Sequence, residues 1–485
     1  MRRLSPETLA DAAATRPSYD RSKVTPGIVH LGIGAFHRAH QAVYVDGILD
    51  RAPDWGIVGA SLRRPDTKDA LDPQGGLYTV AVRDASGTAC RVIGSVLEVI
   101  DATTDGEKLL QLMASPAIRI ISLTVTEKGY CHDPATGHLD LNHKDVVHDL
   151  ADLQHPVSAP GFIVAALERR RQAGLKPFTV MSCDNLPSNG HTARRIITEF
   201  AAKVGPETHA YVESVDFPST MVDRIVPATT DADRAAVAEA IGLEDAWPVV
   251  TEPFTQWVVE DRFGAGRPPF ETVGAELVTD VEPYERMKLR MLNGAHSTLS
   301  YLGYLAGHEY VADVMRDENF TKLIHGLMTE EVIPTLSMPG VDLGFYRDQL
   351  LERFANPALK HRTWQIAMDG SQKLPQRLLA TISDRLAAGQ GIERLALGVA
   401  AWMRYTSGPD ERGQPIDVRD PLSERFIDIA ANALEDNAAL VDGYLGIREV
   451  FGDSLPANKA FRDLLVRHME SLVSRGSAAT VAATA

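Results

Sequence analysis

The segment from Gly27 to Gln41, GIVHLGIGAFHRAHQ, constrains the fold more than any other part of the chain. Ile28 to Leu31 form a short apolar run that predicts a buried strand, and Gly32-Ile33-Gly34 predicts a tight turn. The residues from Phe36 to Leu49 then predict a helix. A strand, a Gly-x-Gly turn and a helix together aim free backbone N–H groups at one place, which suits a pyrophosphate. An ordinary strand-to-helix turn remains the alternative, because His37 replaces the third glycine of the usual fingerprint.

Three further apolar runs in the first half of the chain are short and rich in β-branched residues. They span Trp55 to Leu62, Ile118 to Val125 and Phe178 to Cys183. Helical patterns lie between several of these runs, for example over Gly161 to Gln172. Strands that alternate with helices are typical of a doubly wound parallel sheet, so this half predicts an α/β, Rossmann-like fold.

The pattern changes after Pro283, where long helical periods replace the strand signals. Phe320 to Pro334 and Pro421 to Leu440 are examples. We therefore predict a Rossmann-like dinucleotide-binding domain over residues 1–282 and a mainly α-helical substrate and catalytic domain over residues 283–485. The last residues, from Ser474 onward, are small and polar, and we expect them to fray.

Charge and composition argue against several classes of protein. The chain has 485 residues, a formal net charge of −16 and a pI near 5.4, which disfavour nucleic acid or an anionic membrane as its partner. Cys90, Cys131 and Cys183 have no metal-type spacing and suggest no disulfide framework, which favours a reducing cytosol. No apolar run is long enough to span a bilayer, and Met1 to Pro6 lack the apolar core of a signal peptide. We expect a cytoplasmic protein that binds a small molecule and no metal, with a monomer as one possible state.

A second informative segment runs from Pro283 to Tyr304, PYERMKLRMLNGAHSTLSYLGY, and predicts one helix. At about 100° per residue, Lys288, Asn293 and His296 fall within one sector about 140° wide, and Glu285 lies in the same sector. A lysine amine can accept the proton of a secondary alcohol, and an amide can hydrogen-bond the oxyanion that forms as hydride leaves. These residues therefore favour an alcohol dehydrogenase, with a solvated polar stripe on a surface helix as the alternative.

Other polar residues follow strand-like runs, at the ends where open α/β sheets bind their ligands. Asn185 closes the polar cluster Ser182-Cys183-Asp184-Asn185, and it would either face a ligand or cap the next helix. Asp223 is a candidate for binding the substrate. Because Arg224 follows it directly, a simple salt-bridged pair is the alternative for this residue.

These motifs resemble one family almost from end to end, the polyol-specific long-chain dehydrogenases. The motifs that carry the resemblance are GIGAFHRAHQ from Gly32, TVTEKGYC from Thr124, VMSCDN from Val180, FPSTMVDRIVPA from Phe217, EPFTQWVVED from Glu252 and MKLRMLNGAHS from Met287. The K-x-x-x-x-N-x-x-H pattern within the last of them is specific to the family.

The resemblance implies a role for each of the polar residues. Lys288 would be the catalytic base, kept neutral by burial and a nearby cation. Asn185 and Asn293 would hold the oxyanion, and His296 would position the reacting hydroxyl. The implied cofactor is NAD. The residues that we expect to bind NAD are Gly32, Gly34, Ala35, Phe36, His37, Arg38 and Asp66.

The end of the second predicted strand bears on the choice between NAD and NADP. It reads Ser61-Leu-Arg-Arg-Pro-Asp66. The dinucleotide fingerprint expects a carboxylate for the ribose hydroxyls at this place, and Asp66 is the nearest candidate. Arg63 or Arg64 would instead accept a 2′-phosphate. The family resemblance favours NAD.

The stretch from Arg353 to Leu379, RFANPALKHRTWQIAMDGSQKLPQRLL, distinguishes the branches of this family. It looks like the fructuronate reductase branch, which implies interconversion of D-fructuronate and D-mannonate. A sugar acid carries a carboxylate that a polyol lacks, so its recognition calls for a fixed cation. Arg362, Lys373 and Arg377 are the candidates, and helix capping or pairing with Asp369 is the alternative for each.

Two other functions remain open at this point. A mannitol 2-dehydrogenase would use the same scaffold on an uncharged substrate. A catalytically silent nucleotide-binding regulator would keep the glycine turn and lose turnover. The intact lysine, asparagine and histidine set favours an enzyme over a regulator.

Overall fold

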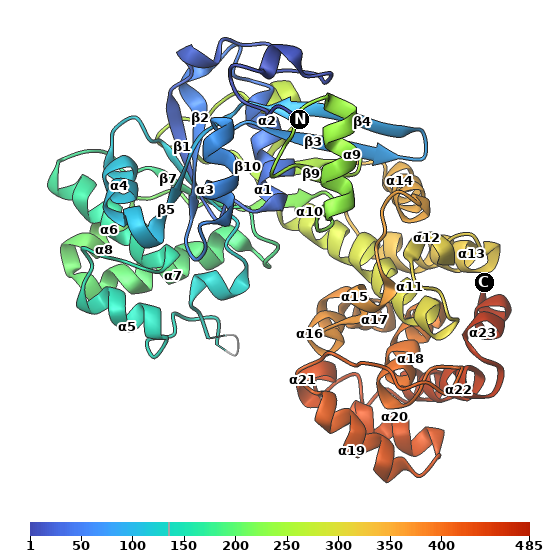
Figure 1. Cartoon of the computed structure of the whole chain (residues 1–485). Helices are drawn as coiled ribbons and strands as arrows, with labels where there is room; N and C mark the ends of the chain where they lie inside the picture. Colours follow the sequence, from blue (N-terminus) through green and yellow to red (C-terminus); the bar gives the residue numbers. More distant parts are fainter. Residues whose placement is uncertain (134–135) are drawn as a thin grey trace. The chain divides into compact units, whose positions relative to one another are not determined.

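The computed structural model describes residues 1–133 and 136–485. The chain divides into two compact units, Met1–Glu282 and Pro283–Ala485. The first unit mixes strands and helices, and the second is helical (Figure 1). The α/β fold class with a mainly helical second part, predicted from the sequence, is confirmed.

Within the described residues, the first unit is built around a five-stranded sheet in the order β5-β2-β1-β6-β7. All neighbouring strands run parallel, and Val29 pairs with Val58 on one side and with Ile121 on the other. The strands are β1 Pro26–Leu31, β2 Gly56–Ser61, β5 Val96–Asp101, β6 Ile120–Leu123 and β7 Thr179–Ser182. The chain runs outward from β1 in one direction and then from β6 in the other, so a topological switch point lies between β1 and β6.

Apolar side chains fill both faces of this sheet, which is why its strands are near-continuous apolar runs. One core cluster joins Val29 and Ile121 to the helices α4 Ala102–Ala114, α6 Ala159–Gln172 and α7 Asn189–Val204. A second cluster, around Ile28 and Trp257, extends to smaller strands. Those strands form the sheets β4-β3-β9 (β3 Tyr78–Asp84, β4 Gly87–Ile93, β9 Val249–Thr251) and β11-β10-β8 (β8 Thr220–Asp223, β10 Gln256–Glu260, β11 Glu276–Val278).

The second unit packs its helices around α11 Gly294–Leu305, in which every residue except Tyr304 is buried. Its neighbours include α18 Glu393–Ser407 and α15 Thr363–Ala367. The other helices are α10 Glu282–Met287, α12 Val311–Val314, α13 Glu318–Gly326, α14 Leu343–Ala355, α16 Gly370–Leu374, α17 Ala380–Ala387, α19 Ser423–Ala433, α20 Asn437–Leu445, α21 Arg448–Phe451, α22 Lys459–Arg475 and α23 Ser477–Thr484.

Several helical runs of this unit contain π-helical segments, at Lys288–Asn293, Leu327–Val332 and Pro375–Leu379. A π turn closes its hydrogen bonds between residues five apart and not four, so it places an extra residue in the turn. The first of these segments follows α10 and leads into α11, and the last follows α16 and leads into α17. Such segments are frequent at functional sites.

The single helix predicted over Phe36–Leu49 is wrong. The structure has α1 Ala35–Ala39 and α2 Gln41–Asp46, separated at His40, whose φ of −122° and ψ of −93° are not helical. The His40 Nε2 lies 2.8 Å from the carbonyl oxygen of Gln256, and its ring meets the edge of Trp257. This tertiary contact outweighs the local helical preference.

Two expectations for the C-terminal part also fail. The helix predicted over Pro421–Leu440 is interrupted, because Leu434 and Glu435 have positive φ values of 48° and 69° and α20 begins after them. The tail does not fray. It forms α23, in which Val481 is fully buried and the Ser477 hydroxyl donates to the carbonyl of Leu302 at 2.7 Å. Packing against α11 stabilises this helix, which its small side chains would not do alone.

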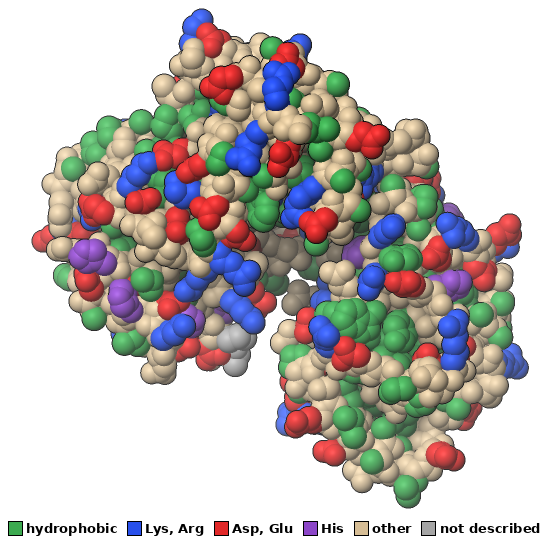
Figure 2. Space-filling model, in the orientation of Figure 1, with side chains coloured by type: hydrophobic (Ala, Val, Ile, Leu, Met, Phe, Trp, Pro, Cys, Tyr) green, Lys and Arg blue, Asp and Glu red, His purple; other side chains and the backbone are tan. Residues whose placement is uncertain are grey.

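No helix among the described residues is long and apolar enough to cross a membrane. Figure 2 shows acidic and basic side chains mixed over the visible face of each unit.

Candidate active site

The glycine turn after β1 depends on two close backbone approaches. Gly32 has a φ of +90°, and a Cβ atom on it would lie 2.3 Å from the carbonyl oxygen of Thr124, directly after β6. Only glycine tolerates both conditions. A Cβ on Gly34 would meet nothing nearer than 3.8 Å, so the next part of the turn is open on its outer side. The turn thus presents accessible backbone at the switch point, where α/β sheets bind their ligands.

A pocket of about 280 Å³ opens beside this turn. Its lining residues are Gly34, Ala35, Arg38, Thr67, Thr229, Arg234, Trp247 and Pro248. Burial lowers the pKa of Arg38 to about 10, which leaves its guanidinium charged at neutral pH. One Nη of Arg38 donates to the carbonyl of Trp247, while its buried Nε has no hydrogen-bond partner among the described residues. Two arginines and two threonines around an open glycine turn suit a phosphate-bearing ligand.

A series of hydrogen bonds between buried polar side chains holds the glycine turn in place. His30, in β1, lies 2.8 Å from the hydroxyls of both Ser122 and Thr124, and the Thr124 hydroxyl donates to the carbonyl of Gly32 at 2.8 Å. His37 stacks on His30 with ring centroids 3.4 Å apart. His37 occupies the position of the third glycine of the fingerprint. At this position α1 therefore packs on β1 through the stacked imidazole rings of His37 and His30. Burial lowers the pKa of His30 to about 3, so that ring is neutral.

The remaining residues predicted to bind the cofactor lie around this region. Phe36 stacks on His40 with ring centroids 5.1 Å apart. Asp66 is exposed at the start of α3 Asp66–Leu71. Arg63 pairs with Asp145 at 2.5 Å, while Arg64 is exposed.

The loop after β6 is strained and is held by a carboxylate at the end of β7. Thr126 has a φ of 64° and a ψ of 167°, which is an outlier for a β-branched residue. Asp184 accepts hydrogen bonds from the backbone N–H groups of Val125 and Thr126, at 3.1 and 2.8 Å, and from the Tyr130 hydroxyl at 2.8 Å. Burial raises the pKa of this carboxyl group. The clamp fixes the backbone immediately before Asn185.

Asn185 and Asp223 lie on the edges of two different sheets of the first unit. Asn185 is exposed after β7, and Ser188, not Asn185, occupies the cap position of α7. Asp223 ends β8, opposite Gln256 of β10. Arg224 donates to the carbonyls of Ala39 and Glu252, which ties it to the end of α1.

In the second unit, Lys288 and Asn293 begin and end one π-helical segment, and His296 follows in α11. The expectation of a uniform 100° per residue is therefore wrong, because the π turn shifts the phase of Asn293 and His296 relative to Lys288. All three side chains are buried, with 8%, 9% and 8% exposed. A solvated surface stripe does not fit that burial. The Nδ2 of Asn293 has no hydrogen-bond partner among the described residues, so this amide is available to a ligand.

His296 lies among aromatic rings and basic groups. Its ring stacks on Phe354 at a centroid distance of 4.9 Å and meets His361 edge-on at 4.8 Å. Burial is the main cause that lowers the pKa of His296 well below its usual value, and His361, Arg377, Arg353 and Lys373 lower it further. The ring is neutral, in surroundings suited to an anion.

The three candidate cations of the Arg353–Leu379 stretch differ in placement. Lys373 is partly buried, and its Nζ donates to the carbonyls of Met368 and Ile366 at 2.5 and 3.4 Å. Arg377 belongs to the π-helical segment Pro375–Leu379 and donates to the Ser297 hydroxyl at 3.1 Å, beside His296. Arg362 is exposed and lies 3.5 Å from a carboxylate oxygen of Glu309.

The close packing of two π-helical segments explains this geometry. Lys288–Asn293 contacts Pro375–Leu379, and a Cβ on Gly294 would lie only 2.8 Å from the carbonyl oxygen of Arg377. Pro375 lacks the N–H that an α-helix would use at its position, which favours an irregular turn there. The glycine and the proline together bring Arg377 beside α11.

The sequence prediction missed His361, Phe354 and Arg353, which all lie near His296. All three belong to the Arg353–Leu379 stretch, where the sequence predicted only Arg362, Lys373 and Arg377 as binding residues. Only contacts between segments far apart in the sequence place these residues near His296, and periodicity within one helix does not contain such contacts.

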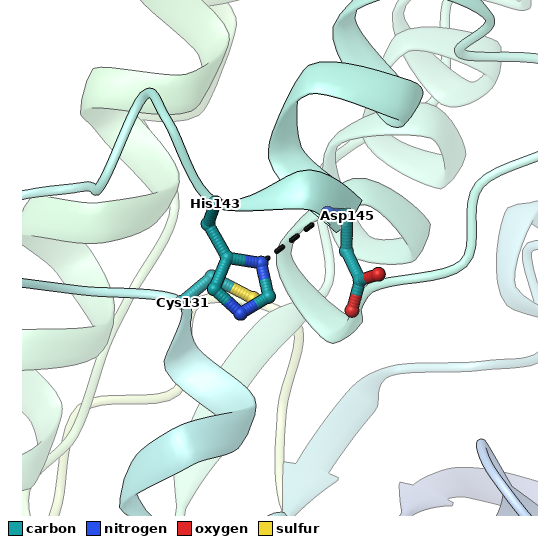
Figure 3. Close-up of side chains that lie close together, drawn as sticks. All are labelled: Cys131, His143 and Asp145. Atoms are coloured by element: carbon teal, nitrogen blue, oxygen red, sulfur yellow. Dashed lines mark hydrogen bonds between the residues drawn. The ribbon is translucent and has the colours of Figure 1, made fainter.

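A different cluster lies in the first unit, where ligand-type atoms of Cys131, His143 and Asp145 are within 4.8 Å of one another (Figure 3). His143 Nδ1 accepts the backbone N–H of Asp145 at 3.3 Å and caps α5 Lys144–Ala151. The Asp145 carboxylate pairs with Arg63 at 2.5 Å. Burial raises the pKa of the Cys131 thiol to about 12, which disfavours the thiolate that a metal needs. We assign this cluster to the anchoring of α5.

Comparisons with known proteins agree with both units. Residues 26–272 match the mannitol dehydrogenase Rossmann domain family, and residues 280–473 match the mannitol dehydrogenase C-terminal domain family. The chain is 50% identical over 478 residues to Uncharacterized oxidoreductase YdfI of Escherichia coli K12, with 98% of each chain covered. It is 49% identical over 475 residues to the D-mannonate oxidoreductase of the same organism, covering 96% of this chain and 97% of the relative.

A solved structure gives the same result. The Pseudomonas fluorescens mannitol 2-dehydrogenase, in a ternary complex with NAD and D-mannitol, matches with a TM-score of 0.86 and 40% identity. The match covers 99% of this chain and 98% of that one. The resemblance found in the sequence motifs is confirmed over nearly the whole length. The chain therefore belongs to the mannitol dehydrogenase family of oxidoreductases.

Proposed function

We propose that this oxidoreductase is an NAD-dependent fructuronate reductase, which interconverts D-fructuronate and D-mannonate. The observation that carries the proposal is the charge around His296. Arg377, Arg353 and Lys373 are the ionic groups that bear most on this ring, and all of them are basic. These groups can donate hydrogen bonds to the hydroxyls of a polyol, but they stabilise the carboxylate of a sugar acid more strongly. The 49% identity to a D-mannonate oxidoreductase supports the same choice.

Lys373 and Arg377 are the proposed partners of the substrate carboxylate. Both are partly buried, and their described hydrogen bonds go to carbonyl or hydroxyl oxygens and not to carboxylates. The carboxylates of Asp369 and Asp420 interact with the Lys373 charge electrostatically, but neither is its described hydrogen-bond partner, so both cations can still bind an anionic ligand. Arg362 stays a weaker candidate because it is exposed and lies beside Glu309. Asp223 stays a prediction from the sequence, as a residue that binds a substrate hydroxyl.

The first unit fits a dinucleotide at the glycine turn. The open backbone at Gly34, the unpartnered Nε of Arg38 and the pocket between them would hold the phosphates. Asp66 would bind the ribose hydroxyls of the adenosine. Ala35, Phe36 and His37 complete the predicted set. When bound, NADH supplies the hydride for the reduction.

The second unit supplies the proton chemistry. In the reducing direction, the Lys288 amine in its protonated form gives a proton to the oxygen of the C5 ketone. In the oxidising direction, the neutral amine takes the proton of the C5 hydroxyl. The free Nδ2 of Asn293 donates a hydrogen bond to that oxygen while it carries negative charge. The neutral ring of His296 orients the reacting hydroxyl, and Asn185 is the predicted second donor to the oxyanion.

The test compares D-fructuronate with D-fructose, which has a ketohexose skeleton without the acid. A charge-assisted hydrogen bond contributes roughly 1.5–3 kcal/mol, so kcat/KM should favour fructuronate by about 10- to 150-fold. Lys373→Met should remove much of this preference and leave slow fructose reduction intact. Lys360→Met, an exposed lysine in the same stretch, is the matched control and should behave like wild type.

The second candidate is a mannitol 2-dehydrogenase, favoured by the 40% identity to the enzyme solved with D-mannitol. Equal or better kcat/KM on fructose, with no effect of Lys373→Met on the ratio, would assign the chain to that function.

A further inference from the structure

A polar side chain that no part of the predicted site includes lies directly beside His296. His361 is in the segment between α14 and α15, and its ring meets that of His296 edge-on, with an interplanar angle of 81°. His296 also stacks on Phe354, at an interplanar angle of 28°. The His296 ring therefore contacts one apolar ring and one ring that carries nitrogen donors and acceptors.

The backbone of His361 is well held. Its N–H donates to the carbonyl of Leu359 at 2.7 Å, and its carbonyl accepts from the N–H of Val311 at 3.0 Å. The next residue, Arg362, forms an isolated bridge with Tyr310. These bonds fix the start of the His361 side chain relative to α12, so the ring position does not rest on a loose loop.

One nitrogen of this ring is buried and unused. The Nδ1 of His361 has no hydrogen-bond partner within residues 1–133 and 136–485. Buried polar atoms are normally hydrogen-bonded, and an exception calls for an explanation, such as a missing ligand. The Nδ2 of Asn293, on the same α10–α11 run as His296, is unpartnered in the same way. Both atoms belong to the group of side chains around the candidate catalytic residues.

The protonation state of His361 determines which groups its Nδ1 can hydrogen-bond. Burial and the nearby Lys373 ammonium lower the pKa of His361 to about 4, so the ring is neutral at physiological pH. A neutral imidazole has one donor and one acceptor, which matches a hydroxyl group. It adds no charge for the carboxylate, whose proposed partners are Lys373 and Arg377.

We propose that His361 is a substrate-binding residue, whose Nδ1 hydrogen-bonds a hydroxyl group of the ketose next to the carbon that reacts at His296. This proposal rests on the proposed function for the presence of a ketose substrate, but not for its carboxylate. A hydroxyl common to D-fructuronate and D-fructose is sufficient. The role therefore differs from that of Lys373, which distinguishes the two substrates.

The experiment compares His361→Phe with His361→Asn in the full-length enzyme. Phenylalanine keeps a planar ring and removes both nitrogens, whereas the asparagine amide can place a polar atom near the former Nδ1. We expect His361→Phe to lower kcat/KM about 10-fold or more on both ketoses, with the KM for NADH unchanged. His361→Asn should restore most of that loss. His308→Phe, whose ring packs edge-on against Phe320, is the control and should have wild-type kinetics.

Three results would overturn the proposal. Wild-type kcat/KM in His361→Phe would show that the nitrogen binds nothing. Equal losses in the Phe and Asn variants would show that the ring acts through packing only. A rise in the KM for NADH of the same size would place the defect in the cofactor. Failure of the proposed function is a separate outcome, because a fructose-specific enzyme would still show the effect of His361 on fructose.

Discussion

The two units present their candidate functional groups by opposite means. In the first, the ligand-facing surface after β1 is mostly backbone, and its key residues are glycines that must lack a side chain. In the second, Lys288, Asn293 and His296 act through their side chains, from a helical run distorted by a π turn. A backbone site depends on conformation at a few positions. A side-chain site depends on the phase and packing of whole helices.

This difference predicts how each unit tolerates change. Around Gly32, any Cβ atom collides with the Thr124 carbonyl, whatever its chemistry. In the second unit, truncating a side chain leaves the buried helix in place and removes one chemical group. Substitutions in the first unit should therefore affect cofactor binding and folding together, whereas those in the second should separate chemistry from stability.

The largest expected effect comes from Lys288→Ala. Removing the proposed proton-transfer group should lower kcat by about 10²-fold or more, with little change in the dissociation constant of NADH. Steady-state kinetics and NADH fluorescence titration measure the two quantities. Lys322→Ala, an exposed lysine on α13, is the control. Near-normal turnover in Lys288→Ala would remove this residue from the mechanism.

A different result is expected for Gly32→Ala in the first unit. The added Cβ would lie 2.3 Å from a carbonyl oxygen on a residue whose φ is +90°. Local distortion should weaken NADH binding about tenfold or more and lower the melting temperature at the same time. A Cβ on Gly391 meets nothing within 4 Å, so Gly391→Ala should change neither quantity. If Gly32→Ala bound NADH as tightly as wild type, the backbone account of this site would be wrong.

The first unit was the more predictable of the two from its sequence. Apolar β-branched runs and a Gly-x-Gly turn are local signals, and the predicted parallel sheet is confirmed. The prediction that failed in this unit was the single continuous helix over Phe36–Leu49. The break at His40 arises from its contacts with Gln256 and Trp257, more than 200 positions along the chain. No local pattern contains such a contact.

In the second unit, the sequence identified residue types better than their arrangement. The segment from Pro283 to Tyr304 predicted one helix. Because Lys288 to Leu292 are all good helix formers, the sequence gives no sign of the π turn over Lys288–Asn293. His361 was missed because it contacts His296 from the segment between α14 and α15, far from α11 in the sequence. The α23 tail was misjudged for the same reason, since its order comes from packing on α11.

The preference for NADH or NADPH tests the role of Asp66, an exposed residue predicted to bind the ribose of the cofactor. We expect a higher kcat/KM with NADH than with NADPH, because the Asp66 carboxylate would repel a 2′-phosphate and Arg63 is held by Asp145. Asp66→Ala should raise kcat/KM with NADPH about tenfold, a change of about 1.4 kcal/mol. Asp69→Ala, exposed on the same helix, is the control. A wild-type preference for NADPH would point to Arg64 as the determinant.

The smallest expected effect is the pH dependence of substrate preference. It tests only the side-chain site of the second unit. Burial, with the nearby Arg377, lowers the pKa of Lys373 to about 8. Lys373 is a charged ammonium below that pH and a neutral amine above it. The cation that would bind the substrate carboxylate is therefore lost as the pH rises. From about pH 7 to about pH 9 its charged fraction falls from about 90% to about 10%.

The ratio of kcat/KM on fructuronate to kcat/KM on fructose isolates this titration, because groups that serve both substrates cancel in it. The ratio should fall up to about tenfold over the same interval of about two pH units. Lys373→Arg should keep the ratio high throughout, since a guanidinium stays charged, whereas Lys373→Met should make it low and flat. A ratio that stays high and constant in the wild-type enzyme would show that the cation that binds the carboxylate is Arg377 and not Lys373.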